Sequence, residues 1–261
     1  MKLHDNAFSP FARKVRLVLE LKKLPHEVVD GLALENRERL AAVNPRVEVP
    51  ALEDRGVVVI GSSDIVAYLE RVYPDAPVYP AAHADFVHAR AWERCADTVI
   101  DPILIDVSYW MWAERPDTMP AGMLDAARKD MATVYDALER DLGDRSFLGG
   151  DRPCIADVAL FPHIASTRML GLAYDAARVP RVHGWMQRLR AHPTFAADLA
   201  RVKTFLAKYA EAGAHERRKL FWRGDRIEWV LARGFHGWFM KEIAEGRVLW
   251  PGLGVPGPRA A

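Results

Sequence analysis

A serine and a proline near the start of the chain have the types and spacing that favour anion chemistry. Ser9 directly precedes Pro10, and this pair is typical of a helix start, with a hydroxyl at the N-cap and a ring that needs no N–H. The first amides of such a helix are unpaired and carry the positive end of its dipole. An anion beside Ser9, such as a thiolate, would meet an O–H donor and a positive field. The alternative is that Ser9 only caps the helix.

The composition indicates a globular chain and argues against a general nucleic-acid or membrane binder. The chain has 261 residues, half of them hydrophobic, and a formal net charge of +1 at pH 7. This length suits one large domain or two ordinary ones. The chain opens on a polar stretch, and no apolar run approaches the length of a spanning helix, so we expect a cytoplasmic protein. Two cysteines, Cys95 and Cys154, make no disulfide framework and fit a reducing compartment.

Strands and helices alternate around Ser9 over residues 1–75. The second helix must end before Pro45, because the residue that precedes a proline is pushed out of the helical region. The order βαβαββα predicts a compact α/β domain with a mixed sheet. The expected strands are 1–4, 26–29, 49–52 and 57–60, and the expected helices are 10–24, 35–43 and 65–72.

Several segments of this domain have types and spacing that together carry a resemblance: Ser9-Pro10-Phe11, Lys14-Val15-Arg16, Asn44-Pro45, Val49-Pro50-Ala51-Leu52, Ser62, Ile65 and Tyr68-Leu69-Glu70. With these residues the domain resembles the thioredoxin-like domain of the cytosolic glutathione transferases, of the serine type seen in bacterial, theta, zeta and tau relatives. The stretch from Phe147 to Asp157 looks like the signature of that family's second domain. The resemblance implies a cis Val49–Pro50 peptide bond, a backbone pairing of Val49 with the cysteinyl part of glutathione, and a bond from Ser62 to the γ-glutamyl carboxylate. The residues expected to contact glutathione are Ser9, Phe11, Val49, Pro50, Ser62 and Ser63.

Elementary chemistry supports these expected contacts. A free strand edge at Val49 can pair with an extended peptide, and a helix that begins at Ser62 offers a hydroxyl and amides to a carboxylate. A plain turn at Pro50 and a plain cap at Ser62 are the alternatives. Gly61 stands where relatives have Glu, Gln or Asp, and Glu48 stands where many have Lys. Both departures favour a weak affinity for glutathione.

Residues 85–210 are expected to form an all-α helical bundle, after a proline-rich linker at 76–84. Asp157 and Cys154 have the spacing of a capping box. By resemblance, Phe11, Tyr109 and Trp112 line a hydrophobic substrate pocket, with core packing as the alternative for the last two. The expected helices are 83–114, broken or bent near Pro102, then 117–142, 154–172, 179–192 and 194–210.

Residues 211–261 form an extension beyond the resemblance. Asp225 could cap one amphipathic helix that reaches Ile243, weakened by Gly234 and Gly237 and followed by a Gly/Pro-rich tail. Residues 201–261 hold 12 Lys and Arg against 6 Asp and Glu. Packing of this helix on the protein's own body is favoured over a subunit contact or an anionic membrane surface.

The resemblance implies an enzyme that activates the glutathione thiol as a thiolate for attack on a small hydrophobic electrophile. Glutathione would be its co-substrate, Ser9 its catalytic residue, detoxification its role and a cytoplasmic homodimer its form. Ser9 cannot form the mixed disulfide of cysteine-bearing relatives. No metal, nucleotide or nucleic-acid partner is predicted, since no matching motif appears. The alternative, suggested by Gly61 and Glu48, is a non-catalytic binding or regulatory protein with the same fold.

Overall fold

A computed structural model of the chain describes residues 1–112, 119–211, 220–221 and 223–250. The chain divides into two compact units. In its described part, the first unit combines Met1–Phe86 with Leu189–Glu211, and the second combines Val87–Arg188 with residues between 220 and 250. The helix α9 (Pro193–Glu211) therefore groups with the strands, although it lies in the helical half of the sequence.

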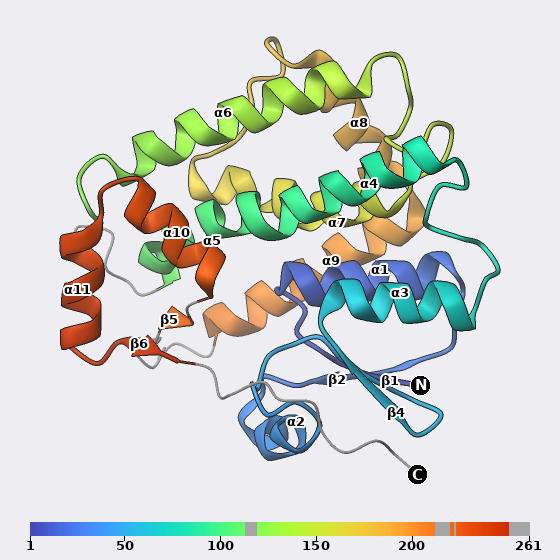
Figure 1. Ribbon diagram of the computed structural model, residues 1–261, viewed down its shortest axis with the longest axis horizontal. Helices are drawn as coiled ribbons and strands as arrows, with labels where there is room; N and C mark the ends of the chain where they lie inside the picture. The colour runs from blue at the N-terminus through green and yellow to red at the C-terminus, as the bar shows by residue number, and fades with distance from the viewer. Residues whose placement is uncertain (113–118, 212–219, 222, 251–261) are drawn as a thin grey trace. The chain divides into compact units, whose positions relative to one another are not determined.

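The first unit is built on a mixed four-stranded sheet in the order β2-β1-β3-β4. β1 and β2 are parallel, and β3 is antiparallel to both of its neighbours. The predicted order βαβαββα is confirmed, with α1 and α3 side by side on one face of the sheet and α2 on the other (Figure 1). The elements are β1 (Lys2–Asp5), α1 (Pro10–Leu21), β2 (Glu27–Asp30), η1 (Leu34–Asn36), α2 (Arg37–Val43), β3 (Ala51–Asp54), β4 (Val57–Ile60) and α3 (Ser62–Val72).

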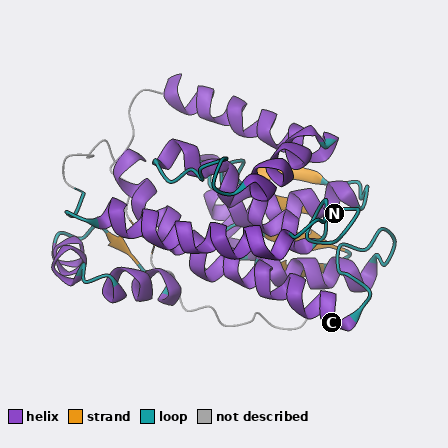
Figure 2. Cartoon of the chain, turned by 90° about the horizontal axis from the view of Figure 1, so that it is seen from above, coloured by secondary structure: helices purple, strands orange, loops and turns teal. Residues whose placement is uncertain are grey.

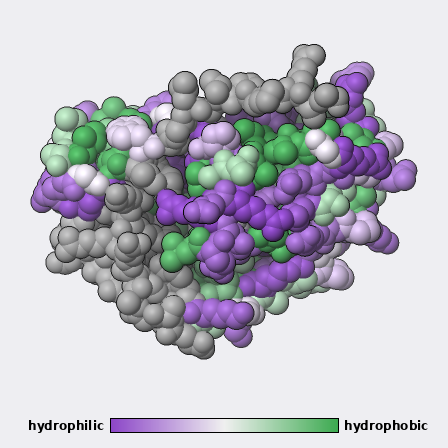
Figure 3. All heavy atoms as spheres, turned by 90° about the horizontal axis from the view of Figure 1, so that it is seen from below, coloured by the Kyte–Doolittle hydropathy of each residue, from purple (hydrophilic) through white to green (hydrophobic). Residues whose placement is uncertain are grey.

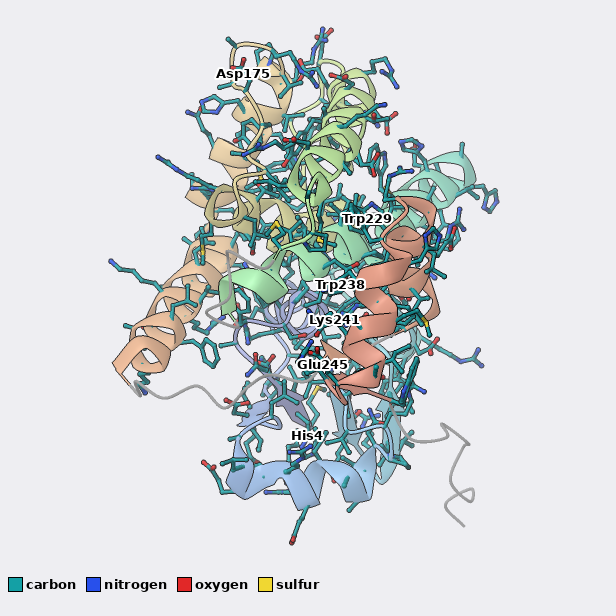
Figure 4. The ribbon with its side chains drawn as sticks, turned by 90° about the vertical axis from the view of Figure 1, so that its left-hand side faces the viewer. His4, Asp175, Trp229, Trp238, Lys241 and Glu245 are labelled. Atoms are coloured by element: carbon teal, nitrogen blue, oxygen red, sulfur yellow. The ribbon has the colours of Figure 1, made fainter. Side chains whose placement is uncertain are left out.

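The two faces of the sheet are buried by different helices. Leu3 and Leu52 are paired across β1 and β3 and are completely buried, as an alternating strand pattern requires. His4 points to the opposite face, where it is buried above α2 (Figure 4) and its ring bonds Glu53. The chain passes close beside His4 at Gly31, where an added Cβ would lie 3.0 Å from Val49.

Four buried charges join β1, α1 and α9 within the first unit. Asp198 on α9 accepts hydrogen bonds from Arg13 Nε at 2.9 Å and Nη2 at 2.6 Å, and from Arg16 Nη2 at 2.8 Å. Arg16 also bonds Asp5 at the end of β1. All four side chains are at most 2% exposed. Because buried charges are tolerated only when they are paired, this network fixes the three elements together.

The described part of the second unit is helical apart from the short pair β5 (Leu220–Phe221) and β6 (Val248–Leu249) (Figure 2). The predicted all-α second domain is confirmed. Its helices are α4 (His83–Cys95), which begins in the first unit, η2 (Ala96–Ile100), α5 (Asp101–Trp112), α6 (Met123–Leu142), α7 (Ile155–Ser166), η4 (Thr167–Leu170), α8 (Pro180–Ala191), α10 (Gly224–Ala232) and α11 (His236–Ala244).

The interruption expected near Pro102 is confirmed, and it has the form of a π-helical turn. The segment η2 is π-helical and ends two residues before Pro102. Proline has no N–H for the carbonyl four residues earlier, and a wider turn relieves its clash with the preceding backbone. The long predicted helix is therefore divided into α4 and α5.

The capping box at the start of α7 is confirmed. The completely buried Asp157 carboxylate accepts bonds from the amides of Cys154 at 2.8 Å and Leu148 at 2.9 Å, and from Trp185 Nε1 at 2.7 Å. Burial raises the pKa of Asp157 while these donors oppose the change. Burial also raises the pKa of Cys154, which fits a structural thiol.

The prediction of one long helix in the extension is wrong. The structure has two short helices, α10 and α11, because Gly234 adopts a left-handed conformation with φ of +82° between them. Arg223, not Asp225, is the N-cap residue of α10, and the Asp225 carboxylate bonds the Arg223 side chain. The Gly/Pro-rich tail from Leu253 lies outside the described residues.

The helix α10 packs on the protein's own helices. Arg226 Nε bonds Asp101 at 3.0 Å, and the Asp130 carboxylate on α6 accepts bonds from Trp229 and Arg233 at 2.7 to 3.0 Å. Trp229 is nearly buried, and Figure 4 shows it on α10, with Trp238 along α11. This arrangement is the one that the amphipathic pattern favours.

One face of the molecule shows described residues of mixed hydropathy. Hydrophobic residues form separate groups between hydrophilic ones on the face shown in Figure 3. Among the described helices, none has the length and apolarity that a membrane crossing requires.

We predict that Asp157→Ala destabilises the second unit strongly. The substitution leaves the amides of Leu148 and Cys154 and the indole of Trp185 without their acceptor. Each buried unpaired donor costs about 1–3 kcal/mol. Thermal unfolding followed by circular dichroism should show a large fall in Tm. Asp151→Ala, in the exposed loop just before α7, is the matched control and should leave Tm unchanged. Equal Tm values for the two variants would contradict the role of Asp157.

We also predict that Asp130→Ala loosens α10 without unfolding the rest of the second unit. It removes the shared acceptor of Trp229 and Arg233. Hydrogen exchange of residues 224–232 should then rise by roughly tenfold, as local opening becomes easier. Lys241→Ala, which removes an exposed ion pair with Glu245 at the end of α11, is the control. Unchanged exchange in α10 after Asp130→Ala would show that apolar packing alone holds this helix.

Candidate functional site

Three segments predicted to bind a ligand meet at one end of the sheet in the first unit. β1 ends at Asp5, shortly before Ser9. The register pairs His4 with Ala51 and Ala51 with Ile60, so β3 begins and β4 ends beside the end of β1. Val49, Pro50 and Ser62 flank these strand ends in sequence. The topology therefore brings Ser9, Val49 and Ser62 to the same end of the sheet.

Ser9 is the N-cap residue of α1, as predicted. Its φ and ψ are −65° and 119°, and its hydroxyl accepts a bond from the Ala12 amide at 3.4 Å, with Pro10 at the first helical position. This bond uses a lone pair of the hydroxyl and leaves its hydrogen to donate. The side chain is half-buried. Capping and donation to an anion are therefore compatible at Ser9, and the two interpretations do not exclude each other.

Asn6 shapes the loop that carries Ser9. Its side-chain oxygen accepts a bond from the Phe8 amide at 3.1 Å, its side-chain nitrogen donates to Asp30 at 3.2 Å, and its carbonyl accepts from the Ser9 amide at 3.0 Å. These three bonds give Asn6 a structural role in the turn. Ser9 is the better candidate for contact with a ligand.

The helix α3 begins without a side-chain cap. Gly61 is the N-cap residue, with φ of +86°, and Ser62 and Ser63 occupy the first two helical positions. The alternative that Ser62 is a plain cap is therefore wrong. The first amides of α3 have no partner within the helix and point out of its end, where they can bind an anion. A side chain at Gly61 would be strained and would meet Asp64 Oδ2 at 3.1 Å.

A buried lysine connects the starts of α1 and α3. Lys14 is 1% exposed, its Nζ donates to Ser63 Oγ at 3.2 Å, and it lies 6.0 Å from the ring centroid of Phe11. The structure thus brings Phe11 and Ser63 together around one ammonium group. Sequence reasoning did not place Lys14 in the site. The available signal was a lysine inside a helix with too many apolar residues for a thin stripe, because a buried ammonium needs polar partners.

The Val49–Pro50 peptide bond is cis, as the resemblance implies. Glu48, expected to repel an anionic ligand, is held by Arg46, whose Nε and Nη2 bond its carboxylate at 3.0 and 3.2 Å. Both side chains are about one third exposed, so solvent weakens this pair, but their opposite charges still compensate locally. The negative charge next to Val49 is smaller than the sequence suggests.

The predicted hydrophobic pocket is described only at Phe11. The backbone of α5 reaches Trp112, but the side chains of Tyr109 and Trp112 lie outside the described residues. One turn earlier, Asp106 is buried at 2% exposure, and burial raises its pKa well above the ordinary value despite the nearby Arg226. Sequence reasoning did not single out this residue.

Other features of the described residues do not compete with this site. Within the described ranges, no cluster of three or more His, Cys, Asp or Glu could hold a metal ion. A cavity of about 390 Å³ is lined by Lys2, Glu53 and the turn from Asp54 to Val58, among others. That turn lies at the opposite end of the sheet from Ser9.

Two domain models cover much of the chain. The description "Glutathione S-transferase, N-terminal domain" matches residues 3–77, and "Glutathione S-transferase, C-terminal domain" matches residues 111–188. The first range covers the sheet except for Lys2 and includes all three segments of the candidate site.

Curated proteins and solved structures agree with these matches. The Zea mays protein named Probable glutathione S-transferase BZ2 is 32% identical over 221 residues, which cover 74% of this chain and 87% of that protein. Maleylacetoacetate isomerase of Pseudomonas aeruginosa is 29% identical over 75% of this chain and 93% of its own length. A Methylobacterium radiotolerans glutathione S-transferase, solved in complex with glutathione sulfonate, is 29% identical with a TM-score of 0.63, over 76% of this chain and 93% of the other. The chain therefore belongs to the glutathione S-transferase superfamily.

Proposed function

We propose that the first unit binds glutathione and that Ser9 donates a hydrogen bond to its thiol, which favours the thiolate. The observation that carries this proposal is the hydroxyl of Ser9, which caps α1 by accepting a bond and keeps its hydrogen for a ligand. The positive end of the helix dipole acts on the same point. A related protein was solved with glutathione sulfonate, which supports the choice of ligand.

The other two segments of the site suit the remaining parts of glutathione. The γ-glutamyl carboxylate would accept bonds from the first amides of α3 and from Ser62, and Lys14 adds a positive charge next to Ser63. The γ-glutamyl ammonium would lie toward Asp64, whose carboxylate stands at this helix start. The cysteinyl backbone would pair with Val49, which places the thiol toward Ser9.

The thiolate would attack an electrophilic carbon of a small hydrophobic substrate. A stabilised thiolate is the reactive form of a thiol, and each unit by which its pKa falls corresponds to about 1.4 kcal/mol. Ser9 offers no sulfur for disulfide exchange. Transfer and isomerisation both begin from this thiolate, and relatives named for each reaction match the chain. Phe11, Tyr109 and Trp112 are proposed to contact the electrophile, in a cytoplasmic homodimer.

The structure weakens the case for a non-catalytic protein. That alternative rested on Gly61 and Glu48. Arg46 compensates the charge of Glu48, and Gly61 begins α3 without a side-chain cap on its first turn. Neither residue removes the groups that the proposed reaction needs.

We predict that glutathione binds to the wild-type chain and that Ser62→Ala weakens this binding. Loss of one hydrogen bond to a carboxylate costs about 1.5–3 kcal/mol, or roughly 10-fold to 100-fold in Kd. Titration calorimetry with millimolar glutathione measures both proteins. Ser166→Ala on α7, in the second unit, is the control and should bind like wild type. No heat of binding to wild type would reduce the assignment to a shared fold.

We predict that Ser9→Ala raises the pKa of the bound thiol by about one to two units, because a donor to a charged acceptor is lost. The cap is lost as well, at about 1 kcal/mol of stability. Ser9→Thr keeps a capping hydroxyl and should retain most of the thiolate. Thiolate absorbance is followed against pH in the glutathione complex of each variant. Identical midpoints for wild type and Ser9→Ala would exclude Ser9 as the activating group.

A further inference from the structure

The helix α9 contacts the segment that carries Ser9 through two of its side chains. It comes from residues far along the chain and yet belongs to the first unit. Figure 1 shows α9 beside α1, and the contacts between these two helices agree. Its side chains Asp198 and Phe205 reach different parts of the segment from Asp5 to Arg16.

Asp198 is connected, directly or through Arg16, to residues before and after the loop that carries Ser9. Its two oxygens bind Arg13 and Arg16, which stand one and two turns into α1 from Ser9. Arg16 extends the network to Asp5, the last residue of β1 before the loop. The four residues from Asn6 to Ser9 therefore follow one member of the buried ionic network directly and lie one helical turn before the next.

Phe205 supports the loop itself. Its ring is stacked on Phe8, with centroids 6.4 Å apart and an interplanar angle of 16°. Phe8 directly precedes Ser9, and its amide is bonded by Asn6. A movement of the Phe8 ring would therefore change the backbone that orients the Ser9 hydroxyl.

We propose that Asp198 and Phe205 are positioning residues for Ser9, so that α9 is a structural part of the glutathione site. This inference deepens the proposed function and rests on it for its chemical meaning. A hydrogen bond weakens steeply as its angle departs from linearity, so the direction of the Ser9 hydroxyl decides how well it stabilises a thiolate. The segment that sets this direction is held by α9, which lies outside the consecutive residues of the thioredoxin-like fold.

The test uses three variants of the full chain. Asp198→Asn keeps the size of the side chain and removes its charge, and Phe205→Leu keeps an apolar contact and removes the stacked ring. Glu20→Gln is the matched control, because it breaks the more exposed ion pair with Arg201 that also joins α1 to α9. If Asp198→Asn does not fold, the result with Phe205→Leu alone decides the test, since Phe205 lies outside the buried ionic network.

The first measurement needs no ligand. Hydrogen exchange of residues 6–12 in the free protein should rise by roughly tenfold in Phe205→Leu and in Asp198→Asn, while Glu20→Gln stays at the wild-type rate. Unchanged exchange in Phe205→Leu, or an equal rise in Glu20→Gln, would overturn the proposal. This outcome is independent of whether glutathione binds.

The second measurement is the pH midpoint of thiolate absorbance in the glutathione complex. The bound thiol's pKa should rise by about 0.5 to 1 unit in Phe205→Leu and Asp198→Asn and stay constant in Glu20→Gln. A merely structural role would lower stability and leave this midpoint in place, which would overturn the proposal. If wild type takes up no glutathione, the proposed function fails, and the exchange of residues 6–12 still decides whether α9 holds the loop.

Discussion

The site in the first unit depends on the pairing of Arg13 and Arg16 with Asp5 and Asp198. An isolated charge at this depth would cost several kcal/mol, so the four groups are stable only together and only in this geometry. Burial by itself would lower the pKa of Arg16, but Asp5 and Asp198 keep it above its ordinary value. Burial raises the pKa of Asp5 against the opposing effect of Arg16. The end of β1, the first turns of α1 and the helix α9 consequently form one rigid support.

This support lies next to the groups proposed to react. Its position at the start of α1 leaves the helix end free for Ser9 and directs Lys14 toward Ser63 at the start of α3. The Ser9 hydroxyl, the start of α3 and one buried ammonium group then lie at this end of the sheet, which favours the proposed ligand with a thiol and a carboxylate. Membership of the glutathione S-transferase superfamily and this arrangement both support the proposed ligand.

Local sequence patterns predicted the elements of the first domain, whereas its contacts between residues far apart in the sequence could not be predicted. A short opening strand before the Ser9-Pro10 helix signal placed β1 and α1 within a few residues of their observed bounds. The left-handed conformation of Gly234 divides the extension into two helices, whereas the sequence pattern predicted one. The preference of glycine for this conformation was the local signal for the division. No local rule connects Arg13 with a carboxylate 185 residues away, so the partner of this buried charge and the membership of α9 in the first unit became visible only in three dimensions.

A crystal structure of the chain with glutathione would test the role of Ser9 most directly. We expect the sulfur within hydrogen-bond distance of Ser9 Oγ, the γ-glutamyl carboxylate on the amides of Ser62 and Ser63, and the cysteinyl backbone paired with Val49. A glutathione molecule whose sulfur points away from Ser9, or whose carboxylate binds at another element, would contradict this expectation.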